Sequence, residues 1–516
     1  MNITKALYVA FTQCPALVWN DLFNPLPDDG DRSRAIEGER VGVFARDYFD
    51  NWEMYDFYNP QTKPGVYAEY ILKYKDMECR VDMLVINEDK TVDIYEVKSV
   101  NDVDKDKFLE DISFQYYVVS NAIKSMGLTV KTANLMHFNR DYVYDGKQYD
   151  LKQLFMVSNM TNQIIERLPI VEDKINSLRN LDPNNCPRCP FTGNCKDQHS
   201  LCRYLDRCKA MYGLAKEHSA FELYGNVKKN KLIEDGLLTW GQIYSYRKTE
   251  LSDFNKTMIE CYLNNVQGPV VKKNELKEYL SKITYPIYFF DFEGVQETIP
   301  VYPNSKPYEQ IPFQYSLHIS ESIDDTEEDI VKRHKEFLGN GVDDPREDLI
   351  KQMIQDLGDT GSIIAYHDTY EKSRIKELIQ DFPQYKDELE PLLDRFVDLE
   401  NAFHYHPDYQ FFNKNGERVD KPKGKALTLV YHPLMGTSCS IKYVGPALSP
   451  DRPDLNYHNL EQVHHGGEAV DAYKKLKELT GDERAKLIEN MLKYCCLDTK
   501  SMVVVYLRFL ELIADN

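Results

Sequence analysis

The sequence of 516 residues predicts an α/β protein in which two α/β regions flank a helical segment. Three observations lead to this prediction. Short apolar, β-branched runs such as 92–97 alternate with helical patterns in the first part of the chain, as strands and helices do in α/β folds. A charged, helical pattern follows, and a new apolar strand then begins at 287–290. The predicted regions are 1–210, 211–282 and 283–516.

Composition limits the class of protein. Hydrophobic residues make up 42% and charged residues 28%, as in globular rather than disordered chains. No run of about 18 apolar residues is present, and the apolar patch 6–11 lacks a small-residue cleavage site. We therefore expect a cytoplasmic protein without a membrane segment.

The formal net charge is −20, from 63 basic and 83 acidic residues. Such a charge indicates that bulk attraction does not hold the protein on nucleic acid. The excess of carboxylates is compatible with chemistry that gathers acids around cations, because a bound metal supplies positive charge locally. A nucleic-acid partner would therefore need a local basic path.

A first group of polar residues lies in a predicted hairpin. Asp82 falls in one strand, and Glu96 and Lys98 fall in the next, where a spacing of two places both side chains on one face. The two acids and the carbonyl of Val97 could share a divalent cation, and Lys98 could activate water. The helix predicted next carries Gln115. A plain surface Glu–Lys pair is the alternative interpretation.

This order of an acid, an E-V-K tripeptide and a helical glutamine resembles the RecB-type PD-(D/E)XK nucleases. The resemblance implies a restriction-endonuclease-like fold, Mg²⁺ or Mn²⁺ at the two acids, and a positioning role for the glutamine. Many members carry a His on an early helix, and this chain has none there. Glu39 and Glu69 are possible additional ligands, but we expect both to be surface residues.

Cysteines cluster near the end of the first region. Cys186 and Cys189 form a C-x2-C pair and Cys195 follows, within a Pro- and Gly-containing loop that suits binding of one centre. Three close cysteines are one short of four ligands, and Cys14, near the start of the chain, is a candidate for the fourth. Disulfides are not expected in a cytosolic protein, so these thiols should be free. Further candidates follow the loop: His199, Cys202 and Cys208. The residues alone leave a zinc site and an iron–sulfur cluster both open.

One early Cys-Pro and a late C-x2-C-x5-C around such a core resemble the iron–sulfur nucleases of the AddB and CRISPR-associated RecB kind. The resemblance implies a [4Fe–4S] cluster held by Cys14, Cys186, Cys189 and Cys195. Its role would be structural, because joining segments about 170 residues apart removes much loop entropy from the unfolded chain.

A third group of residues spans the last region. Asp291 and Glu293 share one face at the end of a strand, where two carboxylates repel unless a cation intervenes. Glu371 stands at the start of a helix that follows another strand. Tyr494 and Asp498, four residues apart, share one face of a late helix. Solvated loop acids are the alternative interpretation of the D-x-E pair.

The third group resembles the DEDD exonucleases of the RNase H-like fold, in their Tyr variant. The resemblance implies two Mg²⁺ or Mn²⁺ ions on the four acids, Tyr494 as the residue that orients water, and release of nucleoside monophosphates from a 3′ end. The middle acid of that family is usually Asp, whereas the best match here is Glu371, with Asp368 as the second choice. Asp398 lies where relatives often have an Asp, and we interpret it as structural.

Both halves together resemble an uncharacterised bacterial family that fuses a RecB-type nuclease domain to a DEDD-type domain. The segment 221–242 between them is predicted to hold two short helices around a Gly-containing turn; it weakly resembles a helix-hairpin-helix element, and a plain connector is the alternative. The implied function is a metal-dependent nuclease in repair, recombination or mobile-element defence, with DNA preferred to RNA. The alternatives are an RNA-processing 3′–5′ exoribonuclease and a nucleic-acid-binding scaffold with one inactive site.

Overall fold

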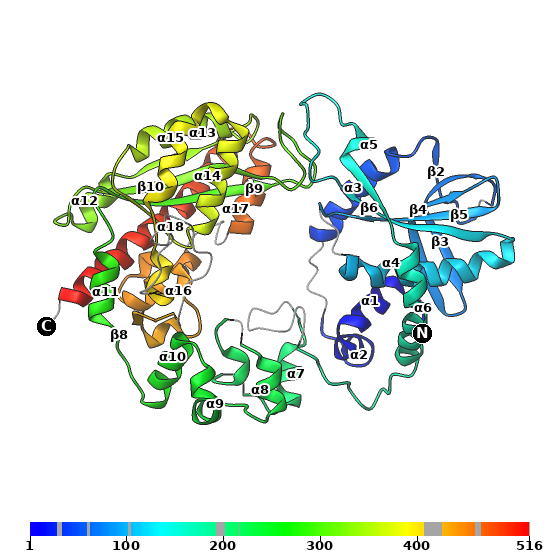
Figure 1. Cartoon of the computed structure of the whole chain (residues 1–516), viewed down its shortest axis with the longest axis horizontal. Helices are drawn as coiled ribbons and strands as arrows, with labels where there is room; N and C mark the ends of the chain where they lie inside the picture. Colours follow the sequence, from blue (N-terminus) through cyan, green and yellow to red (C-terminus); the bar gives the residue numbers. More distant parts are fainter. Residues whose placement is uncertain are drawn as a thin grey trace, which may run out of the picture. The chain divides into compact units, whose positions relative to one another are not determined.

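The computed structural model divides the chain into two compact units (Figure 1). The first comprises 1–216 with 297–309, and the second comprises 217–296 with 310–516. Most of the predicted connector, from Glu217 onward, therefore belongs to the second unit. Helices and sheets occur in both units, which confirms the predicted α/β class. The residues that the structure describes are 1–27, 33–58, 62–101, 105–191, 202–215, 217–225, 227–406, 426–459 and 466–514.

A seven-stranded sheet forms the frame of the first unit in the described residues. Its order is β2-β3-β4-β5-β6-β7, and β1 pairs with β4. Strands β3, β4 and β5 are antiparallel, and β6 is parallel to β5 because the helix α4 (Lys105–Ala122) supplies the crossover. The strands are Ile3–Thr4, Trp52–Met54, Gly65–Tyr74, Met77–Ile86, Thr91–Lys98, Thr129–Phe138 and Phe155–Asn159.

The helices of the first unit cover both faces of this sheet. Helix α4 packs on one face together with α1 (Lys5–Gln13) and α6 (Thr161–Arg179), over an apolar core that includes Val92 and Ile94. Helix α3 (Ser33–Asp47) covers part of the other face. Since side chains alternate along a strand, Glu96 falls on the same face as Val92 and Ile94, toward α4.

Regular alternation breaks at one point of β3 and β4. Buried side chains on the α4 face occur at Tyr67 and then at Tyr70, a spacing of three where a regular strand has two. Between them, Glu69 adopts a left-handed backbone conformation with φ +58°. Ala68 still pairs with Met83 and Tyr70 with Val81, so the break falls opposite Asp82. From Glu69 on β3 and Asp82 on β4 onward, the side chains that point toward α4 are therefore offset by one residue.

The second unit contains a five-stranded sheet of order β11-β10-β9-β12-β13. Strands β9, β12 and β13 are parallel, whereas β10 is antiparallel to both of its neighbours. A separate pair joins β8 (Val270–Val271) to β14 (Val430–Tyr431). The five strands in chain order are Ile287–Gln296, Gln310–Ser320, Lys335–Leu338, Ser362–Ala365 and Phe396–Asp398.

Alternation along β9 decides what each face of this sheet carries. Tyr288, Phe290 and Phe292 belong to the core formed with α13 (Arg346–Leu357) and α14 (Thr369–Asp381). The residues between them project to the opposite face, where Phe289 stacks near Tyr506 of α18 (Gly481–Ala514). Asp291 and Glu293 follow Phe289 on that face, and the long helix α18 packs on β9 (Figure 1).

Shorter helices complete both units. Between the two sheets in sequence, α8 (Lys229–Glu234) and α9 (Trp240–Arg247) are joined through Gly236, whose φ is +74°. No helix among the described residues is long and apolar enough to cross a membrane. The other α-helices are Pro15–Phe23, Leu151–Leu154, Leu205–Met211, Asp253–Leu263, Lys273–Leu280, Glu327–Lys332, Lys386–Leu389, Ile441–Leu448 and Gly466–Lys475.

Candidate metal-binding sites

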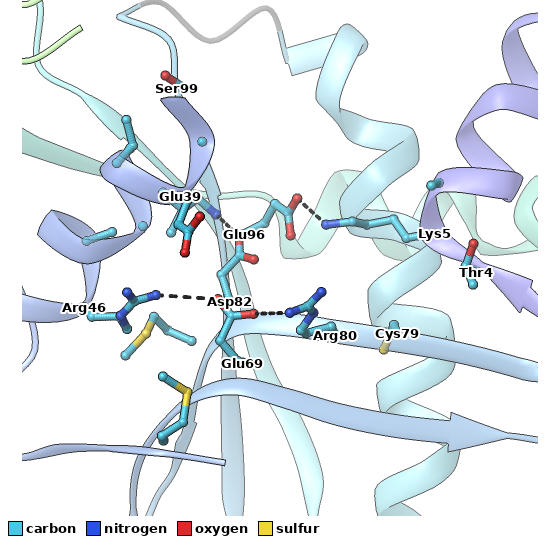
Figure 2. Close-up of a pocket in the computed structure, with 18 of the residues that line it drawn as sticks. Thr4, Lys5, Glu39, Arg46, Glu69, Cys79, Arg80, Asp82, Glu96 and Ser99 are labelled. Carbon is cyan, nitrogen blue, oxygen red and sulfur yellow. Dashed lines mark hydrogen bonds and ion pairs between the residues drawn. The ribbon is translucent and has the colours of Figure 1, made fainter. Parts of the chain in front are cut away.

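The first acid group lines a cavity of about 920 Å³ in the first unit. Figure 2 shows Asp82 and Glu96 there, with Glu39 and Glu69 beside them. From the sequence we expect Glu39 and Glu69 at the surface; Glu39 is exposed and Glu69 is partly exposed, and both also line this cavity, Glu39 from α3 and Glu69 from β3. Glu69 is held by two arginines, Arg46 at 3.7 Å and Arg80 at 3.2 Å.

Glu96 is the centre of a buried ionic network. Its side chain is 2% exposed. Oε1 accepts hydrogen bonds from Nζ of Lys5 at 2.6 Å and of Lys98 at 2.8 Å, and Oε2 accepts one from Nε2 of Gln115. Burial alone would raise the pKa of Glu96, but the charges and hydrogen bonds of the two ammonium groups outweigh this effect and lower the pKa to about 2. Glu96 is therefore a permanent carboxylate at neutral pH.

Lys98 is locked between two acids. Besides Glu96, its ammonium donates to Asp111 on α4, and these charges raise the pKa of Lys98 in spite of its burial. It thus acts as a fixed cation rather than as a base. Sequence reasoning missed Asp111, although it lies one helical turn before Gln115. It also missed Lys5, for which no local spacing gives a signal because 91 positions separate it from Glu96.

Asp82 differs from its neighbour. Its Oδ2 accepts the backbone N–H of Val97 at 2.7 Å, but burial and the nearby charge of Glu96 raise the pKa of Asp82 to about 7. A cation between the two acids would favour the ionised form. The oxygen donors that line this cavity fit a hard divalent cation such as Mg²⁺ or Mn²⁺. Lys5 occupies part of that position on Glu96.

Thiols from the two ends of the first unit lie together. Cys14 separates α1 from α2, and its Sγ is 3.9 Å from Sγ of Cys189. Cys186 lies beside α2, with its Sγ 3.8 Å from Nδ2 of Asn20 on that helix. Three of the four cysteines expected from the sequence are thus brought together, and the fourth, Cys195, lies outside the described residues.

Two further cysteines approach this group. Cys208 on α7 (Leu205–Met211) is 2% exposed, and a hydrogen bond with Cys189, together with burial, raises its pKa strongly. Cys202 also lies close enough to Cys189 for the two to interact electrostatically. His199, another candidate, falls outside the described residues. A buried set of thiols is the donor set of zinc and iron–sulfur centres, so the residues present fit either group.

The second acid group lines a cavity of about 380 Å³ in the second unit. Oxygens of Asp291, Glu293 and Asp498 lie within 4.8 Å of one another. Glu371 and Tyr494 line the same cavity. All five residues selected from the sequence therefore meet, although they come from β9, α14 and α18.

These carboxylates resist ionisation when no cation is bound. Burial and the neighbouring acids raise the pKa of Asp291 well above its ordinary value. Burial, with the charge of Asp498, raises the pKa of Glu293 to about 8, and burial raises that of Asp498 itself to about 6. Two divalent cations would remove this repulsion, so the donor set fits Mg²⁺ or Mn²⁺.

Glu371, not Asp368, is the acid that faces this cavity. Glu371 is 2% exposed, its Oε2 has no hydrogen-bond partner among the described residues, and burial raises its pKa to about 8. Asp368 instead pairs with Lys372, one helical turn away. Asp398 accepts backbone N–H groups of His367 and Glu400 at 2.8 and 3.0 Å, which is the structural role expected for it.

Two supporting residues were not found from the sequence. Tyr457 donates its hydroxyl hydrogen to Oδ1 of Asp498 at 2.6 Å, and Nζ of Lys442 lies 3.2 Å from the hydroxyl of Tyr494. Lys442 lies in the first turn of α16 (Ile441–Leu448). Tyr457 and Lys442 lie far in sequence from the residues that they contact and form no recognisable spacing with them, so only the tertiary fold reveals them.

Comparison with known proteins gives similarity without a stated activity. A family described as a domain of unknown function (DUF2779) matches residues 288–440. This stretch contains Asp291, Glu293 and Glu371, and it ends before α18.

Two curated proteins are similar over part of their length. "Uncharacterized protein MG366 homolog" of Mycoplasma pneumoniae is 22% identical over 312 residues, which are 59% of this chain and 44% of that protein. "Uncharacterized protein MG366" of Mycoplasma genitalium is 24% identical over 310 residues, 54% of this chain and 43% of that protein. The chain thus spans less than half the length of the curated relatives it matches.

The raised pKa values predict a pH dependence of stability. With pKa values of about 8 for Glu293 and Glu371, the folded chain binds more protons than the unfolded chain above pH 4.5, the ordinary pKa of Glu. Stability of the metal-free protein should therefore fall as the pH rises from about 5 to 8. Glu371→Gln should flatten this fall and raise stability at pH 8 by roughly 1 kcal/mol or more.

Thermal unfolding at several pH values measures this effect. Added Mg²⁺ should raise the melting temperature of the wild type most at the high end of the range, and that of Glu371→Gln less. The exposed Glu388 of α15 (Lys386–Leu389) supplies the control Glu388→Gln, which should keep the wild-type slope. An unchanged slope in Glu371→Gln would show that the acid cluster does not strain the fold.

Proposed function

We propose that the chain is a metal-dependent nuclease with one hydrolytic site in each unit and with DNA as its preferred substrate. The observation that carries the proposal is the second acid group: Asp291, Glu293, Glu371 and Asp498 converge in one cavity with Tyr494. Glu371 and Asp498 are buried, Asp291 and Glu293 are half-buried, and the mutual repulsion of four such acids favours a metal-binding function.

The second unit supports an RNase H-like exonuclease domain. Its mixed sheet places the D-x-E pair on the central strand β9, and α18 supplies Tyr494 and Asp498 from the same side. Mg²⁺ or Mn²⁺ bound by these acids would stabilise the attacking and leaving oxygens of a phosphodiester. The hydroxyl of Tyr494, next to Lys442, is positioned to orient the attacking water.

The first unit supports a RecB-type PD-(D/E)XK domain. In the succession β3-β4-β5-α4-β6, Asp82 and Glu96 line the cavity, and Lys98 of β5 and Gln115 of α4 both donate hydrogen bonds to the Glu96 carboxylate. Lys98 is held as a cation, so its part is to offset charge that develops on the phosphate. Mg²⁺ or Mn²⁺ bound at the acids would supply the Lewis acid.

We further propose a [4Fe–4S] cluster at the thiol group of the first unit. Cys14 and Cys189 lie together although 175 positions separate them, so a centre there would join the start of the domain to its end. Such a bond constrains the unfolded chain more than the folded one, and its role would be structural.

Two separate sites predict two separable activities. Lys98→Met should abolish cleavage by the first unit, and Asp291→Asn should abolish 3′–5′ trimming by the second, each by about 100-fold or more because transition-state charge is left unbalanced. Purified protein with Mn²⁺ should be tested on end-labelled single-stranded DNA, duplex DNA and RNA. Asp368→Asn is the matched control, since Asp368 pairs with Lys372.

The pattern of products decides between the functions. Loss of all cleavage in either single variant would contradict two independent sites. Preferential digestion of RNA would favour an exoribonuclease, and no cleavage of any substrate in Mg²⁺ or Mn²⁺ would favour a binding scaffold. Activity in Asp368→Asn together with inactivity in Glu371→Gln would identify the middle acid.

An iron–sulfur cluster predicts colour and iron in the first unit. Protein purified without oxygen should absorb visible light and contain iron and sulfide, and Cys189→Ser should lose both, because a missing thiolate ligand destabilises the cluster. Cys261→Ser, which alters a buried cysteine of α10 (Asp253–Leu263), should keep them. A colourless wild type that contains zinc but no iron would refute the cluster and favour the zinc alternative.

A further inference from the structure

A second set of metal-ligand side chains lies in the second unit, next to the acid cavity. Glu400 belongs to the 3-10 helix η7 (Leu399–Phe403), His404 directly follows it, and Cys439 precedes α16. Their ligand atoms all lie within 4.8 Å of one another. Sγ of Cys439 is 3.2 Å from Oε1 of Glu400 and 3.3 Å from Nε2 of His404.

Tyr224 closes this group from the connector segment. Its hydroxyl lies 2.9 Å from Sγ of Cys439 and 3.1 Å from Nε2 of His404, and its ring stacks on the His404 ring. In a tetrahedral zinc site with Zn–S of about 2.3 Å and Zn–N of about 2.0 Å, neighbouring ligand atoms are roughly 3.3–3.6 Å apart. The separations here, 2.9 to 3.3 Å, are at or below those edges, so zinc binding would require the side chains to move apart slightly.

Hydrogen bonds alone do not satisfy the group. Four short contacts join its atoms: Tyr224–Cys439, Tyr224–His404, Cys439–Glu400 and Cys439–His404. At most three protons are available, from the phenol, the thiol and one imidazole N–H. At least one contact therefore brings two acceptors together, which a cation at the centre would resolve.

We propose that Glu400, His404 and Cys439 bind one Zn²⁺, with the Tyr224 hydroxyl at the fourth position. Thiolate and imidazole select zinc over Mg²⁺, which prefers oxygen donors alone. His367 provides the outer support usual at such sites, because its Nδ1 lies 2.8 Å from Oε2 of Glu400.

Burial and access also fit a metal site. Cys439 is 2% exposed, and Glu400 and His404 are partly buried. Zinc binding would displace the thiol proton of Cys439. A cavity of about 480 Å³ lined by Tyr224 and His404 provides a path for the ion.

The ion would hold one wall of the acid cavity. Ser440 and Ile441, which follow Cys439, line that cavity, and Lys442 contacts Tyr494. Zinc at Cys439 would therefore fix this wall to the connector residue Tyr224. Its role is structural, and it is distinct from the proposed cations at the acids, although Glu400 also lines the acid cavity.

Metal analysis of the full-length protein tests the proposal. Wild type, Cys439→Ser, Glu400→Gln and Cys261→Ser are purified alike, and zinc per chain is measured by mass spectrometry. The thiol group of the first unit is unchanged in all four, so any metal there cancels. We expect one zinc fewer in Cys439→Ser than in the wild type and in Cys261→Ser. Equal zinc content in the wild type and Cys439→Ser would overturn the proposal.

Glu400→Gln keeps the test valid if Cys439→Ser fails to fold. The amide preserves the shape of the side chain but is a poor metal ligand, so zinc affinity should fall at least about tenfold. Titration of Co²⁺ into metal-stripped protein gives thiolate-to-cobalt absorption from this site and from the thiol group of the first unit. Because that group is the same in both variants, the part of the absorption that differs reports this site, and it should require more Co²⁺ in Glu400→Gln than in Cys261→Ser. Identical titrations, with folding verified by circular dichroism, would also overturn the proposal.

Discussion

The fold of the second unit is built around carboxylates that cannot all be charged at once. Oxygens of Asp291, Glu293 and Asp498 lie within 4.8 Å of one another in a cavity, where Asp498 is buried and the other two are half-buried. Burial there penalises every negative charge, and each charge penalises the next. The alternation of side chains along β9 and its packing against α18 hold these acids close together, and a bound cation would offset their repulsion.

The first unit meets the same constraint differently. Its central acid, Glu96, is neutralised by two lysines of the chain itself, and its pKa is low. The remaining strain is concentrated on Asp82, whose pKa is raised to about 7. A cation at the proposed site of this unit would require a rearrangement around Lys5, whereas Oε2 of Glu371 in the second unit has no hydrogen-bond partner among the described residues.

Local patterns predicted the strand and helix positions of the acids well. Spacings of two on β5 and β9 and of four on α18 follow directly from strand and helix periods, and the structure keeps each pair on one face. What the patterns could not predict depends on contacts between distant segments. Lys5 contacts Glu96 because β1 pairs with β4, the neighbour of β5, and Tyr457 contacts Asp498 from a short 3-10 turn.

Departures from regular geometry were equally invisible in the sequence. The left-handed backbone of Glu69 interrupts the alternation of β3, and this partly exposed residue lines the cavity of the first unit. Similarly, Cys439 has no cysteine or histidine near it in sequence, yet the fold sets it against His404 and Glu400. Spacing predicts sites that lie within one or two elements, and tertiary packing decides the rest.

The central claim is that each unit binds divalent cations at its acid group. A crystal structure of the full chain grown with Mn²⁺, examined at a wavelength where manganese scatters anomalously, tests it most directly. The account predicts anomalous peaks among Asp291, Glu293 and Asp498 and between Asp82 and Glu96. Well-ordered acids with no peak at either group would contradict it.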